Sequence, residues 1–514
     1  MSPRDDLVPS GIPTPGAEDA SVTTRKGSAA VAEARTAAGA GAGGPEDVPL
    51  YRARVKVHPK DVKGKFRRLK WAALGILLAI YYLAPWLRWD RGPGAPDQAL
   101  LIDMPARRAY FLWIEIWPQE VYYITFLLML GAFGLFFATS LFGRVWCGFS
   151  CPQTVWTDLF MWVERKIEGD RGARIRLDKA PWTPTKILKR TAKHAAWLLI
   201  SVLTGGAWVL YFNDAPTLVR DFAHLDVSGN VLFFIGLFAG TTYLLAGFAR
   251  EHVCTYMCPW PRFQAAMMDE HSMIVSYEAW RGEPRSRAPR DGDFTGRGHC
   301  IDCGQCVAVC PTGIDIRDGN QLECIGCGLC IDACNDVMQR IGLPANLIAY
   351  DSVVRQKTRA RGVESKIKFV RARTIIYGVL VLLVAGVMVA LLATRSNLDV
   401  SVLRDRNPIY VPLANGDIRN GYTFKILNKA AVAMDYELAL IGLDGAAMSV
   451  LGSDEEGRSL HLSAKPDEVA TYRIFIRAPR SALKGESTAF GFLLTGRGEG
   501  AETAHYDAVF LGPK

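Results

Sequence analysis

Several features that are common in membrane and redox proteins are missing from this chain. No histidine lies in the middle of any of its long apolar runs, which argues against a haem held by two histidines inside a membrane. No charged residue interrupts the second or fourth run, so no proton or ion path is visible there. A phosphate-binding loop is also missing, which argues against ATP-driven transport, and the first residues lack the apolar core of a signal peptide. The last 180 residues contain no cysteine, so no disulfide staples that region.

Long apolar runs dominate the first four fifths of the chain. Half of the 514 residues are hydrophobic, and five runs are each long enough to cross a bilayer as a helix. The runs cover Trp71–Trp89, Val121–Phe142, Ala195–Phe212, Val231–Phe248 and Thr374–Thr394, and aromatic residues stand at several of their ends. We therefore expect a membrane protein with a five-helix transmembrane bundle.

Lysine and arginine are spread unevenly over the segments between these runs. The segment before the first run and the segments 143–194 and 250–373 are basic, whereas 214–230 has only Arg220. By the positive-inside rule, the N-terminus and both basic segments face the cytoplasm, and five crossings put the C-terminal region outside. The net charge of +9 then reflects the cytoplasmic loops of a multi-pass inner-membrane protein rather than nucleic-acid binding. In a Gram-negative cell the outer side is the periplasm.

The two ends of the chain differ in character from its centre. Residues 1–50 are rich in Ala, Gly, Pro and Thr without apolar periodicity, which predicts a disordered cytoplasmic tail. Residues 396–514 contain short alternating segments such as YELALIG (436–442) between turn signals, which is typical of an Ig-like all-β sandwich. The predicted domains are the tail, the first four helices at 51–249, a cytoplasmic ferredoxin-like segment at 250–373, the fifth helix at 374–395 and the β-domain at 396–514.

All twelve cysteines gather in short clusters, which indicates metal ligation in a reducing compartment rather than disulfides. CIDCGQCVAVCP (300–311) and CIGCGLCIDACN (324–335) both have the C-x2-C-x2-C-x3-C spacing of bacterial ferredoxins, in which the fourth cysteine ligates the other cluster. Zinc, the competing interpretation, is not bound with this spacing. Asn335 stands where a proline is usual. We expect two [4Fe–4S] clusters, one on Cys300, Cys303, Cys306 and Cys334, and the other on Cys324, Cys327, Cys330 and Cys310.

A second cysteine pattern recurs at the ends of the second and fourth apolar runs. FGRVWCGFSCP (142–152) and FAREHVCTYMCP (248–259) both carry an arginine followed by Cys-x3-Cys-Pro. Two residues four apart share one face of a helix, so a pseudo-symmetric pair of such units brings four thiols together at the inner leaflet. The thiols would suit Cu(I), but they can also form a redox pair or be small buried hydrophobes. The candidate residues are Cys147, Cys151, Cys254 and Cys258, with His252 and Met257 as possible extra copper ligands.

The sequence that follows Pro152 has apolar positions at helical spacing. These positions predict an amphipathic helix that lies on the cytoplasmic membrane surface.

Together these motifs resemble the FixG/CcoG/RdxA family, the accessory proteins of cbb-type cytochrome c oxidase assembly. The resemblance covers the basic N-terminal segment, the five runs, both Cys-x3-Cys-Pro motifs, the dicluster segment and the β-domain. It implies an oxidoreductase that reduces Cu(II) to Cu(I) for the copper centre of the oxidase, with oxidase assembly factors or copper chaperones as partners. It also makes Cys147, Cys151, Cys254 and Cys258 the candidate copper site. The electron donor is not identified by any motif.

Two other functions fit parts of the pattern. Membrane ferredoxins that resemble NapH and NosR share the paired Cys-x3-Cys-Pro motif and pass electrons from quinol towards periplasmic reductases. The β-domain carries no cofactor motif, which argues against that route. The other alternative is a scaffold for oxidase assembly in which the clusters are structural.

Overall fold

The computed structural model describes residues 56–92, 95–289, 292–429, 432–453, 455–466, 468–497 and 502–513. The predicted tail, residues 1–50, lies outside these ranges. Within them, four helical stretches are long and apolar enough to cross a membrane, and they correspond to the first, second, fourth and fifth apolar runs. They are α2 (Lys65–Leu83) with the short helix Ala84–Trp86, the short helix Pro118–Glu120 leading into α3 (Tyr122–Phe142), α8 (Gly229–Thr242) continued by the π-helix Tyr243–Ala249, and α14 (Ala372–Ala393).

The third run forms a helix as well, but this helix is not among the four. It is α6, Pro184–Val209, and its first half carries Lys186, Lys189, Arg190 and Lys193, which lower its mean hydropathy. Its second half packs antiparallel to α8. The Trp208 and Phe238 rings are 5.3 Å apart near one end, and Trp197 meets Phe248 near the other. The prediction of five spanning helices is therefore supported for four of them.

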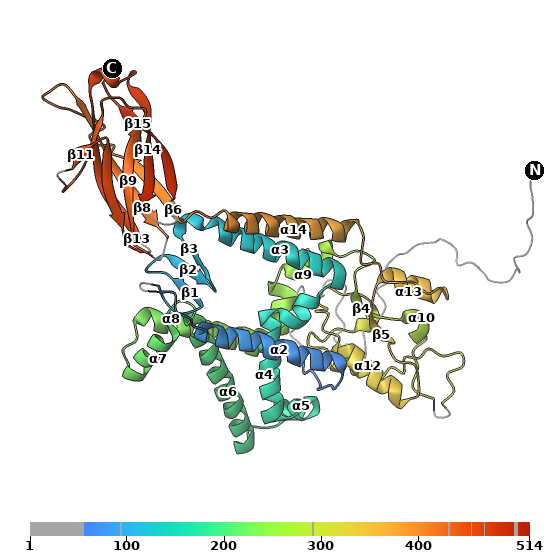
Figure 1. Cartoon of the computed structure of the whole chain (residues 1–514). Helices are drawn as coiled ribbons and strands as arrows, with labels where there is room; N and C mark the ends of the chain where they lie inside the picture. The colour runs from blue at the N-terminus through green and yellow to red at the C-terminus, as the bar shows by residue number, and fades with distance from the viewer. Residues whose placement is uncertain are drawn as a thin grey trace, which may run out of the picture. The chain divides into compact units, whose positions relative to one another are not determined.

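Helices α3 and α14 lie side by side and run antiparallel (Figure 1). Near the start of α3, the Tyr123 hydroxyl donates to the Leu391 carbonyl near the end of α14 at 3.0 Å. At their other ends, the Arg371 guanidinium donates to the Ser140 carbonyl and pairs with Asp269. Apolar side chains cover both helices, and the few polar groups that they carry are satisfied at the helix ends, as a membrane requires.

Shorter helices follow the spanning ones. They are α4 (Pro152–Glu168), α5 (Arg171–Lys179), α7 (Ala215–His224), α9 (Trp260–Met267), α10 (Ala279–Gly282), α11 (Gln305–Ala308), α12 (Leu329–Arg340) and α13 (Val353–Ala360). The helix predicted after Pro152 is α4. Pro152 takes its first position, where a missing N–H costs nothing, and Gly169 ends it at a φ of 93°.

The buried face of α4 carries charge as well as apolar side chains. Glu164 is almost fully buried and lies 3.0 Å from a guanidinium nitrogen of Arg174, 3.0 Å from one of Arg250 and 3.6 Å from the Lys193 ammonium. Burial acts to raise the pKa of this carboxyl, but the three cations outweigh it and lower the pKa to about 2. Glu164 therefore ties α4 to α5, to α6 and to the turn that follows α8.

Two small sheets lie outside the β-domain. Strands β1 (Leu100–Asp103), β2 (Arg108–Phe111) and β3 (Ile114–Ile116) form an antiparallel sheet between α2 and α3. Strands β4 (Ile274–Tyr277) and β5 (Ile348–Asp351) pair antiparallel and bring the two ends of the ferredoxin-like segment together.

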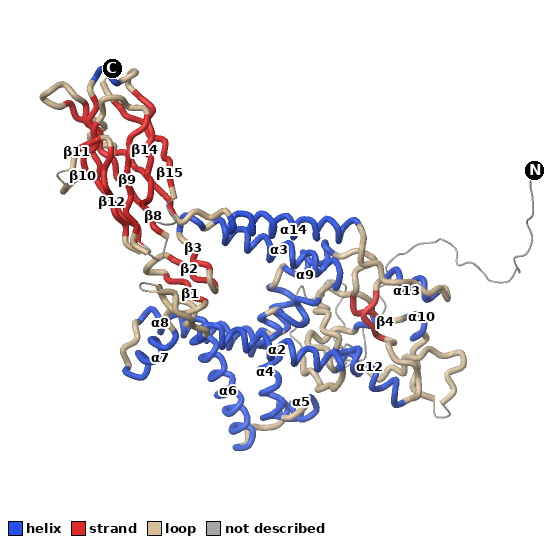
Figure 2. Tube along the Cα trace, in the orientation of Figure 1, coloured by secondary structure: helices blue, strands red, loops and turns tan. Residues whose placement is uncertain are grey.

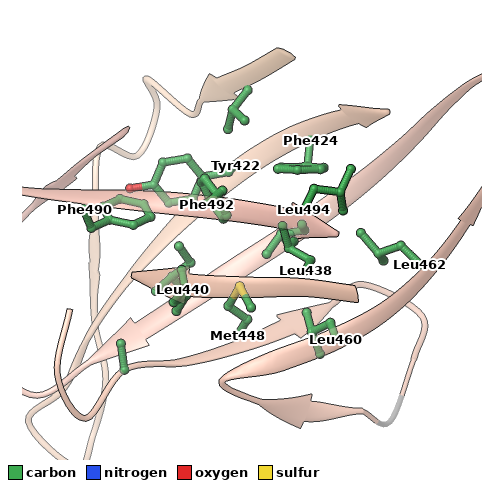
Figure 3. Packing of buried hydrophobic residues seen from close by; sticks show 14 of the residues in the cluster. Tyr422, Phe424, Leu438, Leu440, Met448, Leu460, Leu462, Phe490, Phe492 and Leu494 are labelled. Atoms are coloured by element: carbon green, nitrogen blue, oxygen red, sulfur yellow. The ribbon is translucent and has the colours of Figure 1, made fainter. Parts of the chain in front are cut away.

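The C-terminal region is an all-β domain of two antiparallel sheets (Figure 2). One sheet has the order β11-β10-β13-β8-β6 with β7 beside β8, and the other has the order β12-β9-β14-β15. Burial alternates along the strands, so one face of each sheet supplies the shared core, in which Tyr422 and Phe424 meet Phe490 and Phe492 (Figure 3). The strands are β6 (Leu398–Arg404), β7 (Val411–Pro412), β8 (Ile418–Asn428), β9 (Met434–Ile441), β10 (Ala447–Val450), β11 (Glu456–Gly457), β12 (Ser459–Ala464), β13 (Glu468–Ala478), β14 (Ser487–Arg497) and β15 (Thr503–Leu511).

Candidate iron–sulfur centres and thiol cavity

Each ferredoxin-type cysteine run bends through two residues in the left-handed region. In the first run these are Asp302 and Gly304, with φ of 49° and 62°, and in the second run Gly326 and Gly328, with φ of 68° and 72°. These bends let each run fold back tightly around its cysteines. Gly304 and Gly328 then begin α11 and α12. The two runs are thus repeats in conformation as well as in sequence.

Two cavities divide the eight cysteines of these runs into sets of four. One cavity is lined by Cys300, Cys303, Cys306 and Cys334. The other is lined by Cys310, Cys324, Cys327 and Cys330, and Cys306 also reaches it. The fourth cysteine of each run thus lies with the first three of the other, which is the exchange seen in bacterial ferredoxins.

The chemistry of these donors fits two cubane clusters. Burial raises the pKa of Cys306, Cys324 and Cys334 to about 12, so without metal these thiols are protonated at neutral pH. Iron would displace the protons, because only the thiolate ligates. Tyr277, on β4, lines the first site, and Tyr350, on the paired strand β5, lines a small pocket beside the second site together with Cys324.

The departure at Asn335 has a structural reason. Helix α11 ends at Ala308, so Pro311 lies beyond a helix, whereas α12 continues through Asn335 to Arg340. A proline at that position would lose a helical N–H and clash with the preceding turn. The Asn335 side chain instead accepts a hydrogen bond from the Asn346 N–H at 2.7 Å.

The two Cys-x3-Cys-Pro motifs adopt the same unusual turn. Trp146–Ser150 and Val253–Met257 are single π-helical turns, each closed by a bond from the second cysteine, with Cys151 N–H donating to Trp146 and Cys258 N–H to Val253, both at 2.8 Å. Cys151 and Cys258 both have an extended backbone, and each is followed by a proline and a new helix. The duplicated unit inferred from the sequence thus has a duplicated backbone, although the turn is wider than an α-helical one.

The arginines of the two motifs are not equivalent. The chain enters each turn through a residue of positive φ, which is Gly143 in the first motif and Arg250 in the second. Gly143 and Arg250 each stand four residues before the first cysteine of their motif, so they are equivalent. Arg144 is therefore equivalent to Glu251 and not to Arg250. Arg250 turns towards Glu164, whereas Arg144 turns towards the ferredoxin-like segment.

All four thiols of these turns line one cavity of about 250 Å³, which we call the thiol cavity. Cys324 of the second ferredoxin run lines it too, together with apolar side chains that include Trp146, Val253 and Trp260. Burial raises the pKa of Cys147 and Cys254 to about 12, and the neighbouring thiols add to the rise. Cys258 is exposed and forms the open side of the set.

The thiols do not converge on a single point. Within the described ranges, no three His, Cys, Asp or Glu side chains are grouped closely enough to hold one metal ion. His252 and Met257 do not line the thiol cavity, and His252 stacks on Tyr256 instead. The structure therefore brings together the four predicted cysteines but not the two extra candidates.

Arg144 joins the thiol cavity to the second ferredoxin run. Its guanidinium donates to the carbonyl oxygens of Gln321, Leu322 and Cys324, the last at 2.9 Å. Gly148, inside the first π-turn, packs so closely that a Cβ there would lie 2.9 Å from the Ile325 carbonyl. The sequence marked Arg144 only as a residue just past the membrane, and nothing in it identified the role of Gly148.

The apolar helices, the paired four-cysteine cavities and the C-terminal β-domain together define a membrane-bound dicluster ferredoxin. Matches to known protein families agree with this class. Residues 249–353 match a family model described as a 4Fe-4S dicluster domain, and residues 124–169 match a 4Fe-4S binding domain. Residues 388–513 match an IG-like fold at the C-terminal of FixG, putative oxidoreductase.

Whole-chain relatives give the family. The chain is 45% identical to the nitrogen fixation protein FixG of Rhizobium meliloti over 87% of its own length and 90% of that protein. It is 46% identical to protein RdxB of Cereibacter sphaeroides over 90% and 97% of the two lengths, and 45% identical to RdxA of that organism over 91% and 99%. The chain belongs to the FixG/RdxA family. A solved FixG-related protein from Vibrio parahaemolyticus is 26% identical over 23% of this chain and 97% of its own, with a TM-score of 0.19.

Proposed function

We propose that this membrane iron–sulfur protein delivers electrons to the thiol cavity, where Cu(II) is reduced to Cu(I) for the copper centre of a cbb-type oxidase. The observation that carries the proposal is the cavity itself, which is lined by four membrane-edge thiols and by Cys324 of the second ferredoxin run. Thiolates are soft ligands that favour Cu(I) over Cu(II), so a thiol-lined outlet suits this product.

The eight ferredoxin-type cysteines would hold two [4Fe–4S] clusters with the assignment given above. When bound, the clusters would supply one-electron transfer at a negative potential, which makes reduction of a thiolate-bound Cu(II) downhill. Among the eight cysteines, Cys303 is the exposed one. It gives the first site a side at which a low-potential one-electron donor can approach, whereas Cys324 of the second site lines the thiol cavity.

Shared cysteines and one arginine hold the three sites next to one another. Cys306 lines both ferredoxin cavities, and Cys324 lines both the second of these and the thiol cavity. Arg144 holds the Cys324 loop by three carbonyl oxygens, so the spacing between the last two sites is set by packing rather than by a mobile loop. Copper enters as substrate, and each Cu(II) takes one electron that the donor replaces.

The copper test compares full-length protein in detergent with variants of the thiol cavity. Replacing Cys147 and Cys254 with Ser should abolish Cu(II) reduction by chemically reduced protein and leave the signals of the two ferredoxin-type clusters intact, because neither residue belongs to their sites. Cu(I) formation is followed with a chromogenic chelator. The matched control is Ser150→Ala, which changes the same turn without removing a thiol.

Other outcomes of this test separate the alternatives. If the Cys147/Cys254 variant reduces Cu(II) normally but no longer takes electrons from quinol, the quinol relay replaces the copper proposal. If wild-type protein with intact clusters reduces Cu(II) no faster than a variant without them, the scaffold alternative is correct.

We also propose five crossings, with the clusters in the cytoplasm of the cell and an Ig-like β-sandwich in the periplasm. The contacts sort the connecting segments into two groups. At one end of the helices the Ile102 N–H donates to Tyr211 at 2.8 Å, and Arg395 pairs with Glu120 at 2.9 Å. At the other end the Arg67 N–H donates to Asp332 at 2.8 Å, and Arg144 meets Cys324. Taken in chain order, the segments alternate between these two ends, as five crossings require.

Protease protection tests this topology. Protease added to spheroplasts should cut the β-domain beyond residue 396 but should not reach the segment around Cys303 until the membrane is opened. Membrane vesicles of inverted orientation are the matched control and should give the reverse pattern. Cleavage near Cys303 in intact spheroplasts would overturn the orientation.

A further inference from the structure

The Cys-x3-Cys-Pro sequence occurs three times in the chain. Two copies form the membrane-edge turns, and the third, Cys306 to Pro311, closes the first ferredoxin run. Both cysteines of that third copy line cavities that fit cubane clusters. The membrane-edge motif is therefore a local sequence that also occurs among the cysteines expected to ligate iron.

The thiol cavity has the same set of donors as the two ferredoxin cavities. Each of the three is lined by a set of four cysteines, to which a fifth from a neighbouring set, Cys306 or Cys324, is added in two of them. In each cavity the set of four comes from two separate segments that repeat one another in conformation. In the thiol cavity each π-turn contributes two. A cubane core has four equivalent iron corners, so it accepts two ligands from each of two symmetry-related segments without distortion.

The arrangement fits a cluster better than one copper ion. Ligands of a single ion must converge on one point, and among the described side chains no three potential ligands do so at this place. The eight ferredoxin-type cysteines fail the same criterion, because ligands of a cubane stand apart around its core. The thiol cavity and the two ferredoxin sites thus share one feature, a set of four thiols that stand apart rather than converging on one point.

The surroundings of the thiol cavity also suit an iron–sulfur cluster. Apolar side chains make up most of its wall, and Arg144 supplies a positive charge beside a cluster whose thiolates make it anionic. The match of residues 124–169 to a 4Fe-4S binding domain points the same way, since Cys147 and Cys151 are the cysteines in that range.

We propose that Cys147, Cys151, Cys254 and Cys258 ligate a third [4Fe–4S] cluster at the membrane edge. This inference deepens the proposed function and rests on it only for the direction of electron flow. The thiol cavity then holds a resident redox centre, and Cu(II) takes its electron at the exposed edge formed by Cys258 rather than by displacing all four thiols.

Iron and acid-labile sulfide analysis of the full-length protein tests the proposal. After anaerobic reconstitution with ferrous iron and sulfide, the wild-type chain should hold about twelve of each, and the Cys147/Cys151/Cys254/Cys258→Ser variant about eight, because each cubane carries four. Ser150→Ala is the matched control and should keep about twelve. A wild-type count of about eight that the quadruple variant leaves unchanged would overturn the inference.

A second variant covers the case in which the quadruple variant folds poorly. Cys258→Ala removes one exposed ligand and leaves the buried ones in place. It should lower the iron count by about one to four, because a cubane that loses one thiolate sheds its corner iron or falls apart. The Mössbauer signal of the two other clusters should be unchanged. An unchanged iron count in this variant contradicts the inference.

The outcome is separable from that of the copper test. About twelve irons without Cu(II) reduction would keep the third cluster and remove the copper function. About eight irons, with one Cu(I) retained per chain only when the four thiols are present, would do the reverse.

Discussion

Replacing Cys327 with Ser should remove the second ferredoxin-type cluster and stop electron delivery to copper. Cys327 is buried and lines the second cavity. A hydroxyl is a far poorer iron ligand, and because loss of a neighbouring support alone costs roughly 10–100-fold in metal affinity, loss of a ligand costs more. We expect about four irons fewer per chain and a fall in the Cu(II) reduction rate of at least about a hundredfold.

Iron analysis, EPR of the reduced protein and the chelator assay measure this result. The matched control is Ile325→Val, two residues earlier in the same loop, which keeps every ligand and costs about 1 kcal/mol of packing. It should retain the iron and the activity. Full activity in a Cys327→Ser protein that has lost the EPR signal of the second cluster would show that electrons bypass this site.

The parts of the site that depend on local spacing were predictable from the sequence. The exchange of the fourth cysteines follows from C-x2-C-x2-C-x3-C alone, and the two cavities divide the cysteines in that way. The meeting of Cys147 with Cys254 was inferred from the repeat, since equivalent units tend to pack about a common axis. The π-helical turns were not predicted, because a single inserted residue per turn leaves no periodic signal.

Features that depend on distant partners were not predictable. The link from Arg144 to the Cys324 loop joins residues 180 positions apart, and a positive charge past a helix end is ordinarily explained by membrane topology. The sheet β1–β3 lies between the first two apolar runs, and its strands of only three or four residues are too short to give a periodic signal in the sequence. Four transmembrane helices were clear from length, whereas α6 combines an apolar half with a charged one.

The charged half of α6 leads to the buried carboxylate of Glu164, whose replacement by Gln should strongly destabilise the helical part of the protein. Glu164 lies within 3.6 Å of Arg174, Arg250 and Lys193 and is almost fully buried. A neutral amide would leave the buried Arg174 and Arg250 without this carboxylate, whereas Lys193 keeps Glu168 at 3.0 Å. Breaking a buried pair in this way costs about 3–5 kcal/mol.

The effect of replacing Glu164 depends on the pH at which unfolding is measured, because its carboxyl must be ionised. Its pKa in the folded state is about 2, below the usual value near 4.5, so its stabilisation is complete above about pH 5 and is lost as the pH falls towards 2. At neutral pH the whole effect should therefore be visible, as an earlier thermal unfolding of the detergent-solubilised protein and lower yield in membranes.

A control variant at an exposed carboxylate shows whether the effect comes from the buried charge of Glu164 or from the loss of any ion pair. Asp336 lies 2.6 Å from Arg340 on the surface of α12, and both side chains are at least half exposed. Asp336→Asn should change the free energy of unfolding by roughly 0.5 kcal/mol or less, because water replaces the lost partner. If Glu164→Gln unfolds no earlier than this control, the three cations are solvated independently of Glu164, and the junction of α4, α5, α6 and the Arg250 turn does not depend on its charge.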